Sequence, residues 1–470
     1  MMTLAQLFGF VKGARRFGSG AVTINRVHTD TRSLAPGDLF VALKGDTFDG
    51  NNYLAEAKIN GAVAAIAQSG LAEADLPGVE VADSKLALGE LASAWRRQFE
   101  LPLIAVTGSN GKTTVTQMIA SILRAAEPGR AFSTEGNLNN DIGVPLTLLR
   151  LTNAHRLGVV ELGMNHPGEI AYLAEIVKPT VALVNNAQRE HLEFMGTVDA
   201  VAAENGSVLT SLGLGGTAVF PADDVYSALW RELARDRRVL TFALDGLADV
   251  TAQAKWIGNR WEILADTPDG KFEFQLQVAG RHNVKNALAA AACALAAGVP
   301  LASIASGLCT FAPVKGRSRT VVVNVPDHKL TLIDDTYNAN PDSMRAALDL
   351  LAELPGPRLL VMGDMGEVGS QGAQFHAEAG IYARREGVDC LFTLGEQSAL
   401  ASESFGGGEH FSDVEKLIAA VIEKLPKVGC LLVKGSRFMK MERVVAAVLR
   451  HEQDSALKNK TELMDTRNAA

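Results

Sequence analysis

One glycine-rich segment of the chain has the residue types that bind a phosphate group. Residues 104–114 read Ile-Ala-Val-Thr-Gly-Ser-Asn-Gly-Lys-Thr-Thr, an apolar run that enters a turn and leaves it in a helix-forming sequence. The backbone N–H groups of such a turn, with the N-terminus of the following helix, would face an anion. Lys112 would add a positive charge, and Thr113 would offer a hydroxyl group to Mg²⁺. The segment predicts a nucleotide site formed by Thr107, Gly108, Ser109, Asn110, Gly111, Lys112, Thr113 and Thr114.

The spacing of this segment distinguishes it from the common GxxxxGK[ST] loop. Its first glycine lies only three residues before Gly111, and position 106 is valine. The alternative interpretation is a strand-turn-helix junction whose glycines only permit close packing. Gly-Lys-Thr-Thr directly after a strand favours nucleotide binding instead. Binding alone does not name a reaction, because switches, transporters, kinases and ligases all use such loops.

Two further residues are candidate ligands of a magnesium ion. Glu161 lies near the carboxyl end of the apolar strand 157–162, where open α/β sheets place their ligands. His191 follows the next strand, 180–184, and a neutral imidazole is chemically suited to be a second ligand. The alternatives are a glutamate in a surface ion pair and a loop histidine that is only solvated. The candidate catalytic residues are Lys112, Glu161 and His191, and the candidate metal ligands are Thr113, Glu161 and His191.

Amide-rich loops provide candidate contacts to polar substrates. Residues 134–145 contain three asparagines and an aspartate, although asparagine-rich turns are also common without a ligand. Residues 280–286 open a helix whose N-terminus could hold a base, a ribose or a phosphate, with an asparagine cap as the alternative. Residues 332–341, 363–369 and 434–437 each follow a strand. Because the carboxyl ends of parallel strands share one edge, these three loops predict a ligand-binding face.

The alternation of strands and helices predicts an α/β protein with three domains. Residues 1–98 mix short strands with helical segments and form a small α/β domain. Residues 99–313 form a central domain around nearly continuous apolar strands, which we expect to be covered on both faces. Within it, the alternating stretch 250–278 predicts a hairpin. Residues 314–455 predict a second doubly wound, Rossmann-like unit, and the polar residues 456–470 are expected to be a disordered tail.

Composition excludes several classes of protein. The 470 residues carry 45 basic and 53 acidic side chains, a net charge of −8, and no run of Lys or Arg longer than a pair. Nucleic acid is therefore not an expected partner. No apolar stretch reaches the roughly 20 residues of a membrane span, and no signal-type apolar core is present, so a cytoplasmic protein is expected. The four cysteines lack CxxC spacing, which indicates reduced thiols rather than zinc or disulfides.

Taken together, these motifs resemble those of the Mur ligases, the ATP-dependent amide-forming enzymes of peptidoglycan precursor synthesis. The resemblance spans nearly the whole chain and is carried by the glycine-rich loop and by residues 134–145, 334–341 and 363–369. Within the family, these motifs are similar to those of the member that adds D-alanyl-D-alanine to UDP-N-acetylmuramoyl-tripeptide. The resemblance implies ATP and Mg²⁺ as cofactors, the tripeptide nucleotide and the dipeptide as partners, and a monomer.

The resemblance also implies a mechanism. The terminal carboxylate of the tripeptide attacks the γ-phosphate of ATP, which gives an acyl phosphate and ADP, and the amine of the dipeptide then displaces phosphate. Such a reaction needs neutralisation of charge around the phosphoryl group and alignment of two substrates. Closure of the third domain onto the second would be part of catalysis.

The family pattern assigns further residues to the site. On that pattern Lys112 contacts the β- and γ-phosphates, Thr113 holds one Mg²⁺, and Glu161 with His191 holds the other. The nucleotide would also be contacted by Asn283, Asn286, Arg317, Asp335, Asn338 and Asn340, with Arg317 as a further catalytic residue. The substrates would be contacted by Thr31, Arg32, Ser33, Lys44, Gly45, Asn137, Asn139, Asn140, Asp364 and Lys434.

Two positions depart from the family pattern. The family usually carries a carbamylated lysine on the helix after the His191 loop, whereas the aligned residue here is Asn205, which cannot form a carbamate. We expect Glu204 or a water molecule to supply the missing negative charge near the metal. The Asp-Gly-His motif of the first domain reads Asp49-Gly50-Asn51, which weakens the assignment of UDP contacts near that asparagine.

Two other functions remain open at this point. One is a related ligase that extends a folate or muramyl chain with glutamate or another amino acid. The motif at residues 137–141 is evidence against this alternative. The other is a nucleotide-driven switch or partition protein, which has little use for the polar loops of the third domain. The sequence also leaves open whether the third residue of the tripeptide is lysine or diaminopimelate.

Overall fold

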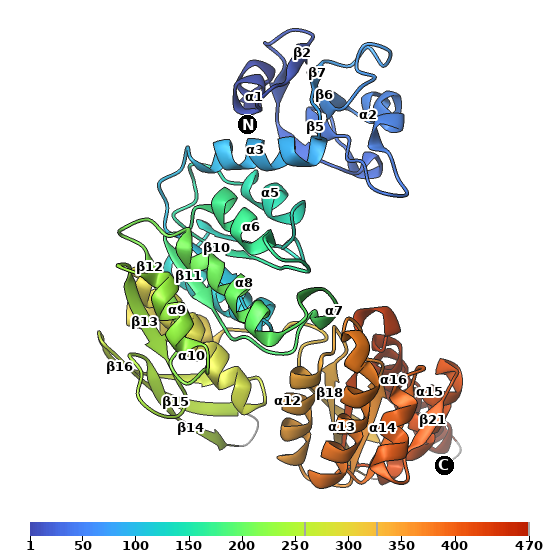
Figure 1. Ribbon diagram of the computed structural model, residues 1–470. Coiled ribbons are helices and arrows are strands. Elements are labelled where there is room, and N and C mark those ends of the chain that lie inside the picture. The colour runs from blue at the N-terminus through green and yellow to red at the C-terminus, as the bar shows by residue number, and fades with distance from the viewer. Residues whose placement is uncertain (258–259, 326–327, 469–470) are drawn as a thin grey trace.

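The computed structural model describes residues 1–257, 260–325 and 328–468 and arranges them as three α/β units in a row (Figure 1). The N-terminal unit comprises residues 2–96, the central unit residues 103–309, and the C-terminal unit residues 319–468. Each unit is built around its own sheet, and all three sheets contain parallel strands. The expected α/β class with three domains is therefore confirmed.

The central unit is built on a six-stranded parallel sheet with the order β13-β12-β11-β8-β10-β9. Its strands are β8 (Leu103–Thr107), β9 (Ala131–Ser133), β10 (Leu157–Glu161), β11 (Val181–Val184), β12 (Thr217–Pro221) and β13 (Arg238–Phe242). Alternate residues of β8 point to opposite faces. Leu103 and Ala105 join one buried core, and Ile104 and Val106 join the other. Both faces are thus buried, which explains why these strands are almost wholly apolar.

Helices cover both faces of the central sheet. One face packs against α4 (Lys112–Ala126), α10 (Arg281–Ala296) and α11 (Leu301–Cys309). The other packs against α5 (Gly143–Leu148), α6 (Glu169–Val177), α8 (Val198–Thr210) and α9 (Ser227–Ala234). The short helix α7 (Leu192–Met195) lies beside the C-terminal unit (Figure 1). The apolar residues of α4 recur every three or four positions and are buried, which fixes the helix that leaves the glycine-rich turn.

A three-stranded antiparallel sheet extends the core beneath α11. Its strands are β14 (Thr251–Ile257), β15 (Arg260–Thr267) and β16 (Gly270–Leu276). Strands β15 and β16 form the expected hairpin, with Thr267 opposite Gly270 across the Asp269-Gly270 turn. Strand β14 is an additional strand that the sequence did not predict. The strand order places β14 at an edge of this sheet, and from Ala252 onward its residues alternate between partly buried and exposed positions.

The N-terminal unit is joined firmly to the central unit by α3 (Ser84–Arg96). Trp95 Nε1 donates to the carbonyl of Leu151 at 3.2 Å, and Arg96 Nε donates to the carbonyl of Val177 at 3.0 Å. One continuous apolar core runs from this unit into the central unit. Besides α3, the elements of the N-terminal unit are β1 (Met2–Thr3), α1 (Leu4–Phe10), β2 (Arg15–Phe17), β3 (Thr23–Ile24), β4 (Arg26–His28), η1 (Thr31–Ser33), β5 (Asp38–Val41), η2 (Gly50–Tyr53), α2 (Leu54–Ile59), β6 (Ala62–Ala67) and β7 (Gly78–Glu80).

The C-terminal unit has a six-stranded sheet with the order β17-β18-β22-β19-β20-β21, in which only the β17–β18 pair is antiparallel. Its strands are β17 (Arg319–Val325), β18 (His328–Asp335), β19 (Arg358–Gly363), β20 (Cys390–Leu394), β21 (Glu409–Phe411) and β22 (Cys430–Lys434). One face packs against α12 (Pro341–Ala352), α13 (Gly372–Arg385) and α14 (Ser398–Phe405), and the other against α15 (Val414–Lys424) and α16 (Glu442–Asn468). The one-turn helices are η3 (Gly369–Gln371), η4 (Leu425–Lys427) and η5 (Arg437–Met439).

Helix α16 corrects the expectation for the end of the chain. It continues to Asn468 and so passes through most of residues 456–470, which the sequence predicted to be a disordered tail. These residues include good helix formers and no proline, so their polarity does not prevent a helix. Residues 469–470 lie outside the described part of the chain. No helix of the described part is both long and apolar enough to cross a membrane.

Ion pairs contribute to the contact between the central and C-terminal units. Arg189, in the loop after β11, places Nη2 2.7 Å from Asp342 Oδ1 and Nη1 3.3 Å from Glu378 Oε2. Its guanidinium also lies over the ring of Phe375, 5.2 Å from the centroid. These contacts join a loop of the central unit to α12 and α13. Ion pairs thus contribute to this orientation, together with Leu192, Trp256 and Ala279 of the central unit, which pack in the apolar core of the C-terminal unit.

We predict that Arg189→Met loosens the C-terminal unit. Methionine keeps the aliphatic contact with Phe375 but removes both ion pairs, which weakens the interface by about 1–3 kcal/mol. Small-angle X-ray scattering should show a larger radius of gyration. The matched control is Arg385→Met, which removes an ion pair with Glu386 inside the same unit. Equal scattering by both variants would show that Arg189 does not hold the interface.

Candidate active site

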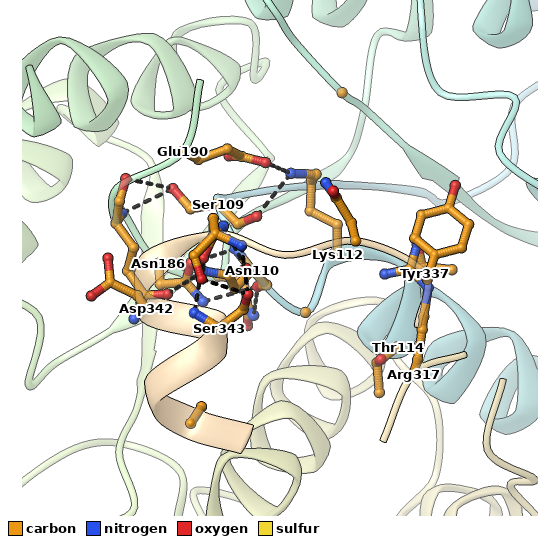
Figure 2. A pocket seen from close by; sticks show the side chains of 18 of the residues that line it. Ser109, Asn110, Lys112, Thr114, Asn186, Glu190, Arg317, Tyr337, Asp342 and Ser343 are labelled. Atoms are coloured by element: carbon orange, nitrogen blue, oxygen red, sulfur yellow. Dashed lines mark hydrogen bonds and ion pairs between the residues drawn. The ribbon is translucent and has the colours of Figure 1, made fainter. Parts of the chain in front are cut away.

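A cavity of about 550 Å³ lies where the carboxyl end of the central sheet faces the C-terminal unit. Figure 2 shows its side chains converging from the glycine-rich turn, the loop after β11 and the start of α12. The predicted residues that line it are Ser109, Asn110, Gly111, Lys112, Thr113, Thr114, Asn137, Asn139, Asn140, Glu161, His191, Asn283, Asn286, Arg317, Asp335, Asn338, Asn340 and Lys434. Loops that are far apart in the sequence thus meet at one site, as the shared edge of parallel strands requires.

Some predicted residues lie elsewhere. Thr107 and Gly108 form the entry to the turn and do not line the cavity. The predicted UDP-sugar residues, Thr31, Arg32, Ser33, Lys44 and Gly45, belong to the N-terminal unit and lie outside this cavity. Asp364, which was predicted to contact a substrate, is engaged with the backbone instead. Its buried carboxylate accepts the backbone N–H groups of Glu396 at 2.9 Å and Ser398 at 2.7 Å. It therefore holds the loop before α14 and does not face a substrate in this arrangement.

The glycine-rich turn is fixed by a close approach that only glycine permits. Gly111 has φ = +81°, and a Cβ there would lie 2.6 Å from Asn286 Oδ1 and 2.8 Å from Asn185 Nδ2. Asn185 Nδ2 donates to the carbonyl of Asn110 at 2.8 Å and to Asn286 Oδ1 at 3.1 Å. Asn286 in turn donates to Asn283 Oδ1 at 3.1 Å. Both predicted nucleotide residues of α10 thus brace the turn, and the N-terminus of α4 faces the cavity.

Lys112 is held by three acceptors. Its Nζ donates to the carbonyls of Gly108 at 2.6 Å and Ser109 at 3.1 Å, and it forms an ion pair with Glu190 Oε1 at 2.6 Å (Figure 2). The two side chains of the pair are only 14% and 10% exposed. The loop carbonyls place the ammonium group beside the turn, where a bound phosphate would meet it.

Glu161 and Thr113 fit a magnesium ion. Glu161 is 2% exposed, and its Oε1 accepts the Thr113 hydroxyl at 3.0 Å and the Asn139 amide at 2.8 Å. Both partners are neutral, so they leave the negative charge uncompensated. A buried carboxylate with neutral partners attracts a cation, and carboxylate and hydroxyl oxygens are ligands that Mg²⁺ prefers. The structure thus brings together two of the three predicted metal ligands.

His191 is engaged differently from the prediction. Its Nε2 lies 3.5 Å from Glu190 Oε1, and its Nδ1 lies 2.8 Å from Glu367 Oε2 of the C-terminal unit. Burial lowers the pKa of His191, but the two carboxylates outweigh this effect and raise the pKa to about 9. A protonated imidazole has no free lone pair for a metal. The ligand role of His191 would therefore need a different arrangement of the Glu367 loop, and it stays a prediction.

Asn205, the expected counterpart of the modified lysine of the Mur ligases, supports the entry to the turn. Its Oδ1 accepts the hydroxyl of Thr107 and the backbone N–H of Gly108, the latter at 2.9 Å. The neighbouring Glu204 was expected to supply negative charge near the metal, but its contacts differ. Its carboxylate accepts the backbone N–H groups of Gly168 at 2.9 Å and Ile170 at 2.8 Å, which caps the start of α6. Glu204 is therefore not the source of negative charge near the metal.

The C-terminal wall of the cavity carries paired charges and a stacked arginine. Lys434 Nζ lies 2.5 Å from Asp335 Oδ2 and donates to the carbonyl of Asn338 at 2.9 Å. Asp335 neutralises the charge of Lys434. The bond from Lys434 to the carbonyl of Asn338 orders the loop after β18. The Arg317 guanidinium lies 3.9 Å from the centroid of the Tyr337 ring (Figure 2). This stacking presents the predicted catalytic arginine to the cavity.

Several residues that line the cavity were not among the predicted site residues. They are Asp141, Asn185, Asn186, Gln188, Glu190, Asp224, Lys285, Tyr337 and Asp342. Asn185 and Asn186 follow β11 directly, so the shared-edge argument could have included them. Lys285 lies one turn inside α10 and Asp342 lies in the first turn of α12, and nothing in the sequence distinguishes them from ordinary surface charges.

Family models cover most of the chain. The Mur ligase family, catalytic domain matches residues 23–96, the Mur ligase middle domain matches residues 106–294, and the Mur ligase, glutamate ligase domain matches residues 317–437. The three matches follow the order of the N-terminal, central and C-terminal units.

Relatives and solved structures match over nearly full length. The UDP-N-acetylmuramoyl-tripeptide–D-alanyl-D-alanine ligases of Escherichia coli strain K12 and Haemophilus influenzae are 41% and 39% identical, over 95% and 92% of this chain and 98% and 95% of theirs. The crystal structure of MurF from Acinetobacter baumannii is 36% identical with a TM-score of 0.88, covering 96% of this chain and 99% of that one. MurF ligase from Thermotoga maritima in complex with ADP is 27% identical with a TM-score of 0.81, covering 92% and 98%. With this site geometry and these matches, the chain belongs to the Mur ligase family.

Proposed function

We propose that this ligase adds D-alanyl-D-alanine to UDP-N-acetylmuramoyl-tripeptide and converts ATP to ADP and phosphate. The observation that carries the proposal is the single cavity that combines a phosphate-binding turn, the buried carboxylate of Glu161 and the amide-rich loop at 137–140. The names of the relatives support the same substrates. The ADP complex of the Thermotoga maritima neighbour supports the nucleotide. The product would be UDP-muramoyl-pentapeptide, and the reaction would be the last cytoplasmic step in the synthesis of this peptidoglycan precursor.

The reaction has two steps that the cavity must align. In the first, a carboxylate oxygen of the tripeptide forms a bond to the γ-phosphorus of ATP while the bond to the β,γ-bridging oxygen breaks, releasing ADP. In the second, the dipeptide amine attacks the acyl carbon, phosphate leaves, and the amine loses a proton. Neither step needs a protein nucleophile, so the chain acts by positioning and by charge neutralisation.

The residues divide these tasks between two units. Lys112 and the N-terminus of α4 would hold the phosphates, and Arg317 would face them from the C-terminal unit. Thr113 and Glu161 would hold Mg²⁺, which neutralises phosphate charge when it is bound. Asn137, Asn139 and Asn140 would contact the peptide. Because the walls come from both the central and the C-terminal unit, the reaction depends on their relative orientation.

The N-terminal unit would bind the UDP-sugar. The proposed residues are Thr31, Arg32, Ser33, Lys44 and Gly45, and η1 begins beside Asp30, whose carboxylate pairs with Arg32 at 2.7 Å. We also propose the domain boundaries 1–98, 99–313 and 314–455, because the first two ends fall in connections between α3 and β8 and between α11 and β17. A monomer is proposed on the family resemblance alone.

The proposed activity predicts that phosphate release requires both substrates. ATP and Mg²⁺ with the tripeptide nucleotide alone should give little release, and addition of D-alanyl-D-alanine should give steady release together with the mass of the pentapeptide nucleotide. Steady release without the dipeptide, or none with both substrates, would contradict the proposal and leave only a nucleotide site.

Lys112→Met should lower kcat/KM for ATP by about 10²–10³-fold, since it removes a charge aimed at the transferred phosphoryl group. Phosphate release with both substrates measures this effect. Lys271→Met is the matched control, because Lys271 is an exposed strand residue that pairs with Asp266. Retained activity of Lys112→Met with an unchanged thermal transition would refute the role of Lys112.

Asn205→Leu should destabilise the turn, because Thr107 and Gly108 would each keep a buried donor without an acceptor. The expected cost is about 1–3 kcal/mol, visible as a lower midpoint of urea unfolding and a higher KM for ATP. Asn205→Asp is the matched variant, since it keeps both acceptor positions and should unfold near the wild-type midpoint. If the two variants unfold alike, Asn205 does not support the turn through these bonds.

A further inference from the structure

The ammonium group of Lys112 has no donor left for a phosphate in this arrangement. A lysine carries three N–H donors, and the three partners are the carbonyls of Gly108 and Ser109 and the carboxylate of Glu190. An incoming phosphate must therefore replace at least one of them. The two carbonyls belong to the backbone of the turn, which is braced from behind by Asn185 and is not free to leave.

Glu190 is the partner that can leave. Its Oε1 contacts Lys112 at 2.6 Å and also lies 3.5 Å from His191 Nε2. Its other oxygen, Oε2, is buried without a hydrogen-bond partner in the described part of the chain. A buried oxygen without a hydrogen-bond partner costs folding free energy. The Glu190 carboxylate is therefore held mainly through its other oxygen, by the ion pair with Lys112. When that pair is broken, the His191 ring remains beside the carboxylate, with Nε2 3.5 Å from Oε1.

A phosphate and Glu190 also cannot share Lys112 without strain. Both are anions, and each would lie within hydrogen-bond distance of the same ammonium group. At such separations, in a site that is only partly open to water, their mutual repulsion is larger than it would be in bulk solvent. Binding of the nucleotide therefore requires that the carboxylate withdraw from Lys112.

We propose that Glu190 sets the nucleotide affinity of this ligase by competing with phosphate for Lys112, so that nucleotide binding exchanges one anion for the other. The inference depends on the proposed nucleotide site. Glu190 is a positioning residue in this scheme, because it acts through Lys112. The exchange also reaches the C-terminal unit, because His191 links Glu190 to Glu367.

The test is the affinity of the full-length chain for ADP in the presence of EDTA, measured by isothermal titration calorimetry. EDTA removes divalent cations, which would otherwise bind the carboxylates. Glu190→Gln keeps the shape of the side chain and removes its charge, so ADP should bind about tenfold more tightly. Loss of a merely structural contact would weaken binding instead. Glu193→Gln, an exposed acidic residue one turn further along, is the control for net charge and should bind as the wild type does.

The double variant separates competition from general repulsion. In a Lys112→Met background there is no cation to compete for, so adding Glu190→Gln should change the affinity for ADP less than twofold. Equal tightening in both backgrounds would overturn the proposal, as would unchanged or weaker binding by Glu190→Gln. Glu190→Ala, checked by its thermal transition, provides a second variant if Glu190→Gln folds poorly. If the wild type does not bind ADP, the nucleotide site itself is refuted, and the inference falls with it.

Discussion

The close approach at Gly111 is the constraint on which the active site depends. The turn can press against Asn185 and Asn286 only because position 111 has no Cβ and adopts a positive φ. That contact ties the end of β8 to the end of β11 and to the start of α10. As a result, the N-terminus of α4, Lys112 and Thr113 face the same cavity as the loops that follow the other strands.

The two connections to the central unit differ in kind, and the difference fits their proposed tasks. The N-terminal unit shares a continuous apolar core with the central unit, so its orientation is fixed by burial of apolar surface. The C-terminal unit has apolar cores of its own, one of which also takes in Ala279, Leu192 and Trp256 of the central unit, and it is further joined by ion pairs and amide contacts such as the mutual pair between Asn110 and Asn340. Polar contacts exchange readily with water, so this unit can be reoriented at a lower cost. The proposed site lies at this boundary, because both units line the cavity.

Several charged side chains that line the cavity are already paired. Lys112 is matched by Glu190 and Lys434 by Asp335, and Asp342 pairs with Arg189 outside the cavity. Glu161 differs, since its hydrogen-bond partners are neutral. Highly charged substrates must therefore break or reorganise existing pairs when they enter. The affinity of such a site reflects an exchange of partners as much as new contacts.

Element types were predictable because periodicity is local. The apolar strands around β8, the amphipathic face of α4 and the β15–β16 hairpin all follow from spacing of two or three to four residues. Strand β14 and the length of α16 were missed. In the edge strand β14, the alternation of apolar and polar residues is weak. In α16, a polar composition does not by itself decide between helix and disorder.

The sequence by itself determined the fold class, the glycine-rich turn between a strand and a helix, and the sheet edge at which the cavity lies, because these depend on local residue types and on strand direction. Only the tertiary structure decided which polar side chains face the cavity. Asp364 directly follows β19 at such an edge, yet its carboxylate accepts backbone N–H groups of the segment before α14, just as the carboxylate of Glu204, within α8, accepts those at the start of α6. Glu190 became a partner of Lys112 through a contact between residues 78 positions apart. A side chain's partner depends on distant backbone that its own sequence neighbourhood does not encode.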